Sequence, residues 1–196
     1  MEDLGTQKLQ TNRLTLRKFE LNDAQSAFKN WMSIDEVTKF LTWKTNKNIE
    51  DSEKTIKLWL NSYNRLDFYQ WNIELKEINE SIGSISLGQI NKKVNSVEVG
   101  YCLGNKWWHR GYMKEALNKI IEFSFERLAI NRLEGRHDTR NVNSGLVMKK
   151  CGLTYEGTLR QADFNNFGIG DMAIYSILKE EYEHKVNLKR VAKTCE

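Results

Sequence analysis

Gly111 lies between a strand-like segment that ends at Leu103 and the clearest amphipathic helix that the sequence predicts. Basic residues stand close to it on both sides, at Arg110 and Lys114. Free backbone N–H groups at a helix N-terminus bind phosphate, and a glycine lets the backbone approach an anion closely. The pattern predicts a diphosphate site, although a plain surface loop with a glycine at a helix start fits the same residues.

The helix after Gly111 has a continuous apolar face at spacings of three and four, formed by Met113, Leu117, Ile120, Ile121, Ser124 and Leu128. Three strand-like segments come before it, at residues 69–75, 81–87 and 94–103, and their turns predict an antiparallel meander. Gly100 in the third segment indicates a bulge or the close approach of a ligand.

Further elements flank this centre on the N-terminal side. Residues 13–17 alternate apolar and polar side chains, which predicts a half-buried strand. A helix is predicted over residues 22–31, capped by Asn22 or Asp23. A second helix, over residues 48–63, begins where Asn-Ile-Glu-Asp resembles a capping box.

On the C-terminal side the sequence predicts a strand at residues 132–137, a helix at 144–150 and strands at 154–161 and 172–178. The order of elements favours one α/β (α+β) domain. Its sheet of about seven strands is mixed but mostly antiparallel, with helices on both faces. We expect this domain to cover residues 1–182, followed by a charged, helical or frayed tail at residues 183–196.

Composition excludes several classes of protein. The 196 residues are 40% hydrophobic and 29% charged, which is typical of a folded globular chain. The net charge of +4 comes from basic residues interleaved with acids, which argues against a nucleic-acid interface. The three cysteines are far apart, which argues against a disulfide scaffold or zinc site. Neither a signal peptide nor a membrane span is evident, so we expect a cytoplasmic protein without a metal.

Two motifs then give a family resemblance. Trp108-His-Arg-Gly-Tyr-Met113 resembles the acetyl-CoA-binding motif Gln/Arg-x-x-Gly-x-Gly/Ala of the GNAT acetyltransferases; its central glycine matches, while its first and last positions differ. The segment from Asn141 to Gly157 resembles the Asn-x-x-Ser helix and Gly-Phe-x-x-Glu-Gly turn of that family. The opening at residues 9–17 is similar to the ribosomal-protein N-terminal acetyltransferase branch (RimJ/RimL type), and the likeness extends over residues 9–182.

The resemblance implies a sheet splayed at its centre, with the pantetheine arm of acetyl-CoA in the gap. Backbone N–H groups of Tyr101 or Leu103 would then polarise the thioester carbonyl. Asn143 would hold the cofactor arm or cap its helix. The pyrophosphate would lie against the backbone of residues 108–113, which are Trp108, His109, Arg110, Gly111, Tyr112 and Met113.

The same resemblance implies Ser144 as the general acid and Asp163 as the carboxylate that deprotonates the amine through water. Each has a structural alternative, because Ser144 could cap a helix and Asp163 could be an exposed loop carboxylate. His137 and Glu98 are the other candidates for the base. An α-amine with a pKa near 8 needs only a weak base, since its deprotonation at pH 7 costs roughly 1.4 kcal/mol, against roughly 4.6 kcal/mol for a lysine.

These features predict an acetyl-CoA-dependent N-acetyltransferase whose acceptor is a protein or peptide α-amine. A small amine, such as a polyamine, amino acid or antibiotic, is the alternative acceptor. A non-catalytic acyl-CoA-binding protein is the alternative from another class. We expect neither nucleic acid nor a membrane as a partner. The oligomeric state stays open, a homodimer included.

Overall fold

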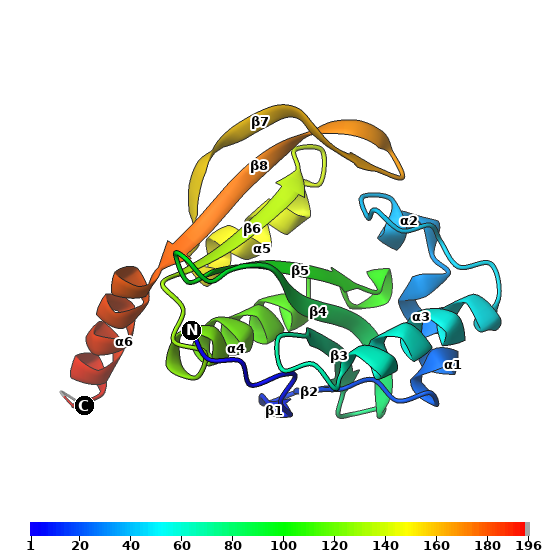
Figure 1. Ribbon diagram of the computed structural model, residues 1–196, viewed down its shortest axis with the longest axis horizontal. Helices are drawn as coiled ribbons and strands as arrows, with labels where there is room; N and C mark the ends of the chain where they lie inside the picture. The colour runs from blue at the N-terminus through cyan, green and yellow to red at the C-terminus, as the bar shows by residue number, and fades with distance from the viewer. Residues whose placement is uncertain (195–196) are drawn as a thin grey trace.

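The computed structural model describes residues 1–194, which form one eight-stranded sheet with helices on both faces (Figure 1). The strand order is β1-β2-β3-β4-β5-β6-β8-β7. The strands are β1 (Leu9–Gln10), β2 (Leu14–Arg17), β3 (Tyr69–Leu75), β4 (Glu80–Asn91), β5 (Ser96–Leu103), β6 (Arg132–Asp138), β7 (Thr154–Asn165) and β8 (Gly168–Leu178). The helices are α1 (Asp23–Ala27), α2 (Asp35–Thr38), α3 (Ile49–Ser62), α4 (Tyr112–Glu126), α5 (Val142–Cys151) and α6 (Lys179–Thr194).

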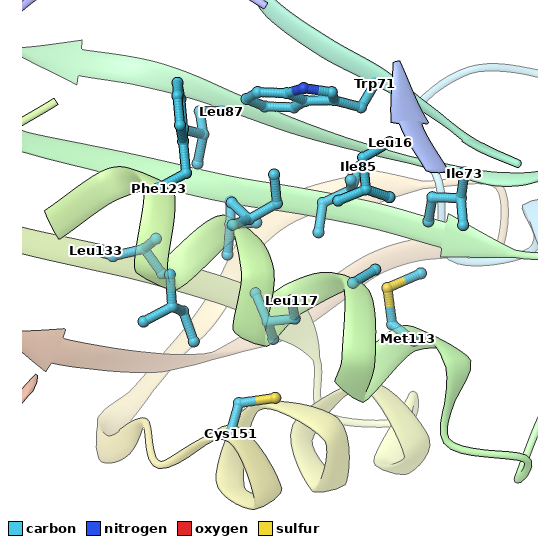
Figure 2. Close-up of a cluster of buried hydrophobic side chains, with 14 of the residues drawn as sticks. Leu16, Trp71, Ile73, Ile85, Leu87, Met113, Leu117, Phe123, Leu133 and Cys151 are labelled. Carbon is cyan, nitrogen blue, oxygen red and sulfur yellow. The ribbon is translucent and has the colours of Figure 1, made fainter. Parts of the chain in front are cut away.

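The predicted apolar face of α4 is confirmed, and it builds the main core. Figure 2 shows Met113, Leu117 and Phe123 of α4 directed at side chains of the sheet, among them Trp71 and Ile85. Leu117, Trp71 and Ile85 are fully buried. Because burying one such side chain contributes roughly 1.5–3 kcal/mol, this layer fixes α4 against the sheet.

The sheet is splayed at its centre, as predicted. β5 and β6 are the parallel pair in an otherwise antiparallel sheet, and their register runs only from Ser96↔Arg132 to Val99↔Gly135. Beyond Val99, β5 stays paired with β4 as far as Leu103, while β6 stays paired with β8. The backbone of residues 100–103 therefore has no strand neighbour on its β6 side.

The N-terminal part differs from the prediction in several ways. The eighth strand is β1, a two-residue strand that pairs with β2. Neither Asn22 nor Asp23 caps α1 as predicted, because Arg17 binds the Asp23 carboxylate at 2.7 Å and the Asn22 side chain makes no cap hydrogen bond. α1 also ends at Ala27 and continues as a π-helix over Phe28–Met32. The Asn48 cap of α3 is confirmed, since its side chain accepts from the Asp51 N–H at 2.9 Å.

The C-terminal strands are longer than predicted. β7 and β8 form a hairpin that arches across the molecule, and its tip points toward α2 (Figure 1). The alternation of side chains is broken by irregular register between Leu159 and Asp163, which hides the strand pattern in the sequence. The expected tail at residues 183–196 belongs to α6 as far as Thr194, and residues 195–196 lie outside the described residues.

Candidate active site

A cavity of about 480 Å³ opens beside the splayed strands. Within the described chain, its lining contains every predicted cofactor or catalytic residue except Arg110 and Asp163. Three segments supply most of its wall: the end of β5, the start of α4 and the start of α5. The lining residues are Val37, Phe40, Leu41, Tyr101, Cys102, Leu103, Trp107, Trp108, His109, Gly111, Tyr112, Met113, Lys114, Asn141, Asn143, Ser144, Leu146, Val147 and Lys150.

Gly111 is the N-cap of α4 and has a left-handed backbone, with φ 79° and ψ 2°. A Cβ atom there would meet only Arg13 Nη2, at 3.6 Å. The glycine is therefore required by the backbone conformation and not by crowding. Helix geometry leaves the first N–H groups of α4 without intrahelical partners, so they can donate to an anion in the cavity.

The start of α4 is held to the turn between β1 and β2 by a half-buried contact that the sequence patterns did not reveal. Glu115 accepts from Thr11 Oγ1 at 2.6 Å, from Arg13 N at 2.8 Å and from Arg13 Nε at 2.7 Å. Burial acts to raise the pKa of Glu115, but these donors lower it below its usual range. Arg13 also donates to the carbonyl of Arg110 at 3.1 Å and lies over the Tyr112 ring.

Positive charge gathers at this end of the cavity. Lys114 and Lys150 are exposed and line it, while Arg110 is exposed just outside. Among residues 1–194 no carboxylate forms an ion pair with these three side chains. Two lysines next to a helix N-terminus suit a diphosphate, because both supply charge-assisted hydrogen bonds. Arg110, the other basic residue predicted to contact the diphosphate, is not among the residues that line the cavity.

Tyr101 and Ser144 meet inside the cavity. Ser144 Oγ donates to the Tyr101 hydroxyl at 3.1 Å, and that hydroxyl donates to the Ser144 carbonyl oxygen at 2.9 Å. Neither Ser144 nor Asn143 caps α5 through its side chain, so that structural alternative is wrong. Burial raises the pKa of Tyr101, against which the hydrogen bond from Ser144 acts.

The two candidate carboxylates lie outside the cavity lining. Glu98 precedes the point where β5 and β6 separate, and its Oε2 is 2.6 Å from Arg136 Nη2. Burial raises the pKa of Glu98 although Arg136 opposes this, and the charge of Asp163 adds to the rise. Asp163 is in β7, where its Oδ1 accepts from the N–H of Phe164 at 2.7 Å. The two carboxylates thus interact, but neither lines the cavity.

His137 is packed beneath α5. Its Nδ1 lies 2.7 Å from the carbonyl oxygen of Asp138, and its Nε2 faces Gly145, where a Cβ atom would stand only 2.5 Å away. The side chain is 8% exposed. This placement favours the structural alternative for His137 over a role as base.

A contact that we call the hairpin clasp joins the β7–β8 turn, residues 165–168, to the loop at residues 38–43. Asn166 Nδ2 donates to the carbonyl oxygens of Thr38 at 2.9 Å and Trp43 at 2.7 Å, and Asn166 N donates to that of Leu41 at 3.1 Å. The rings of Phe40 and Phe167 meet edge to face. The clasp places Phe40 and Leu41 in the cavity wall, a role that no sequence signal indicated.

No group of three or more His, Cys, Asp or Glu side chains in residues 1–194 could hold a metal ion. No helix in that part of the chain is long and apolar enough to cross a membrane.

Comparison with known proteins agrees with this geometry. The family model described as acetyltransferase (GNAT) domain matches residues 13–154. The uncharacterized N-acetyltransferase p20 of Bacillus licheniformis is 31% identical over 174 residues, which covers 89% of this chain and 97% of p20.

Two further matches bear on function. The ribosomal-protein-serine acetyltransferase of Escherichia coli is 28% identical over 127 residues, or 65% of this chain and 70% of that protein. The crystal structure of the microcin C7 self-immunity acetyltransferase MccE, in complex with acetyl-CoA and AMP, has a TM-score of 0.75 at 25% identity, covering 86% of this chain and 93% of MccE. The predicted family is thereby confirmed: the chain belongs to the GNAT acetyltransferases and is an acetyl-CoA-dependent N-acetyltransferase.

Proposed function

We propose that this enzyme acetylates the α-amino group of a protein or peptide. The observation that carries the proposal is the kind of base available near the splay: the candidates are carboxylates, Glu98 just before β5 and β6 separate and Asp163 in β7. A carboxylate acting through water is a weak base. It suffices for an α-amine, whose deprotonation at pH 7 costs roughly 1.4 kcal/mol, but poorly for a lysine at roughly 4.6 kcal/mol.

The cavity offers separate binding groups for the diphosphate and for the pantetheine arm of the cofactor. The free N–H groups of α4 together with Lys114 and Lys150 hold its diphosphate, and the unpaired backbone of residues 100–103 receives its pantetheine arm as an added strand. An N–H of Tyr101 or Leu103 then donates to the thioester oxygen. Such a donor is typically worth about 3 kcal/mol in the transition state.

The acceptor approaches from the face that carries Glu98. Gly100 is exposed on this face, so no side chain covers β5 at the residue that follows its last pair with β6. The amine loses a proton through water to Asp163 or Glu98 and attacks the thioester carbon. The similarity to a ribosomal-protein-serine acetyltransferase supports a protein acceptor.

A small amine is the second candidate, and the hairpin clasp favours it. Asn166 ties the β7–β8 turn to the backbone of the loop at residues 38–43, which narrows the space through which a chain could enter. The two candidates differ in the length of acceptor that the enzyme tolerates.

A panel of acceptors tests the proposal. Purified enzyme and acetyl-CoA are mixed with peptides that have a free N-terminus, with the same peptides blocked at the N-terminus but carrying a lysine, and with polyamines and amino acids. Release of free CoA thiol and the product mass are measured. We expect acetylation of free N-termini only. Turnover restricted to polyamines or amino acids would contradict the proposal and favour the second candidate.

A further inference from the structure

Tyr101 lines the cavity just beyond the point where β5 and β6 separate. β5 and β6 pair last at Val99↔Gly135, and Tyr101 follows two residues later on the side that packs against the main core. Its phenol reaches the first turn of α5 and hydrogen-bonds Ser144 in two ways. Gly145 lets that turn approach β6, because a side chain there would collide with His137.

The direction of these hydrogen bonds matters for catalysis. The Ser144 O–H donates to the phenol oxygen at 3.1 Å, so the serine proton is directed at Tyr101. The phenol proton is directed at the carbonyl oxygen of Ser144, at 2.9 Å. Both residues line the cavity, and each could turn one proton toward a group bound there.

Acid strength separates the two candidates. A tyrosine phenol has an ordinary pKa of about 10 and a thiol one of about 8.5, so transfer between the ordinary groups is uphill by about 1.5 units. Burial raises the pKa of Tyr101 and makes the transfer more uphill, although the hydrogen bond from Ser144 opposes this rise. An aliphatic hydroxyl is closer to water, with a pKa of about 15.7, so transfer from serine is uphill by on the order of seven units. The phenol is therefore the better donor to a leaving thiolate.

We propose that Tyr101 donates the proton to the departing CoA thiolate and that Ser144 is a positioning residue that acts through Tyr101. This inference rests on the proposed cleavage of the thioester in this cavity. The amine nitrogen forms the C–N bond, the C–S bond breaks, and its electron pair leaves with sulfur. The Tyr101 proton passes to sulfur, so that CoA departs as the thiol, and solvent reprotonates the phenolate.

Ser144 stabilises the Tyr101 phenolate that forms when the proton leaves. Its O–H already donates to the phenol oxygen, and a donor to an oxyanion favours the charged form. The carbonyl of Ser144, in contrast, accepts the phenol proton only before the step. Removing the serine hydroxyl is thus expected to weaken the acid without removing it.

Three variants separate the roles by turnover: Tyr101→Phe, Ser144→Ala and the double variant. General acid catalysis contributes about 10²–10⁴-fold, so Tyr101→Phe is expected to lower kcat at least a hundredfold with little change in KM for acetyl-CoA. Ser144→Ala is expected to lower kcat about tenfold and to add nothing in the Tyr101→Phe background. If Ser144→Ala is the more damaging change and keeps its full effect in the double variant, Ser144 is the donor and the inference is overturned.

A binding measurement tests the contact without any acceptor. Calorimetry compares CoA with desulfo-CoA, which lacks the sulfur atom, at a pH where the free thiol is ionised. The wild type is expected to prefer CoA about tenfold because a charged acceptor strengthens the hydrogen bond from Tyr101, and Tyr101→Phe is expected to lose that preference. An unchanged preference would overturn this inference alone. Failure of the wild type to bind CoA would overturn the proposed function with it.

The matched control is Tyr69→Phe. Tyr69 is a buried tyrosine of the same sheet whose hydroxyl accepts from Leu4 N at 3.1 Å, outside the cavity. It reports the effect of losing a buried hydroxyl on thermal unfolding. We expect Tyr69→Phe to leave both kcat and the CoA preference unchanged.

Discussion

The two sides of the site are built differently. The cofactor side comes from one stretch of chain, β5 to α4, joined by the start of α5. The acceptor side depends on the hairpin clasp, in which Asn166 and Thr38 are 128 residues apart. Local sequence patterns describe the first side because a helix N-terminus and a left-handed glycine are local features. The second side exists only when distant segments meet, so it can change without disturbing the first.

This independence means that a change on one side should leave the other side's ligand almost unaffected. Five substitutions test it. They are ordered by the size of the effect that we expect.

Gly111→Val should have the largest effect. Valine is strained at φ 79°, and such strain costs of order 1–3 kcal/mol. We expect acetyl-CoA affinity, measured by calorimetry, to fall at least tenfold. Gly88→Val is the matched control, because a Cβ atom at Gly88 meets nothing within 4 Å and its φ is ordinary. Normal affinity in Gly111→Val would remove the α4 N-terminus from the cofactor site.

Asp138→Asn should weaken the support of the hairpin. The Asp138 side chain is fully buried, and it accepts from Arg140 and from Asn165 Nδ2 at 2.8 Å. Arg140 holds the pKa of Asp138 well below its usual range. We expect a loss of about 2 kcal/mol in the free energy of unfolding at pH 7.

The pH dependence of this loss follows from the direction of the pKa shift. A lowered pKa in the folded state stabilises above the ordinary pKa of 3.8, and this stabilisation disappears as pH falls toward the folded value. Denaturant unfolding of wild type and Asp138→Asn should therefore converge in strong acid. A constant difference at every pH would show that the ionised carboxylate is not what matters.

Asn166→Ala should open the clasp. It removes two side-chain hydrogen bonds to the loop at residues 38–43, each worth about 1 kcal/mol. We expect the KM of the acceptor to change about tenfold, while acetyl-CoA affinity changes less than threefold. Longer peptides should gain relative to short ones if the clasp limits entry. Equal changes for both substrates would break the proposed separation of the two sides.

Asp163→Asn and Glu98→Gln should have the smallest effects and decide which carboxylate is the base. The base must be ionised, and burial raises the pKa of Glu98 above its usual value. If Glu98 is the base, kcat falls as pH drops below that raised pKa, and Glu98→Gln removes this acid limb. If Asp163 is the base, Asp163→Asn lowers turnover several-fold without loss of cofactor affinity. Unchanged turnover in one variant across the pH range removes that residue from the mechanism.

The fold was predictable to a large extent because its signals are periodic. The apolar face of α4 and the meander over β3, β4 and β5 follow from spacings of three, four and two residues. The short strand β1 and the four-residue helix α2 were missed, since neither is long enough to show a period. The cap at Asn48 was predicted correctly, but Asp23 is used by Arg17 instead of its helix.

In the candidate site, the cofactor residues were predicted better than the catalytic ones. Most of the cofactor residues around Gly111 line one cavity, as their spacing along a strand-to-helix turn implied. The partner of Ser144 was not predicted, because Tyr101 reaches it from a strand 43 residues earlier. Asp163 does not line the cavity, and it follows a stretch of irregular register in β7 that local spacing does not reveal.

The sequence alone determined the order of elements, the left-handed turn at Gly111 and the family, because each depends on residues close together in the chain. Tertiary structure decided which proton donor meets which partner and what closes the acceptor side. Those contacts depend on how far β5 and β6 diverge and on where the β7–β8 turn docks. Both are consequences of packing between segments that have no common period in the sequence.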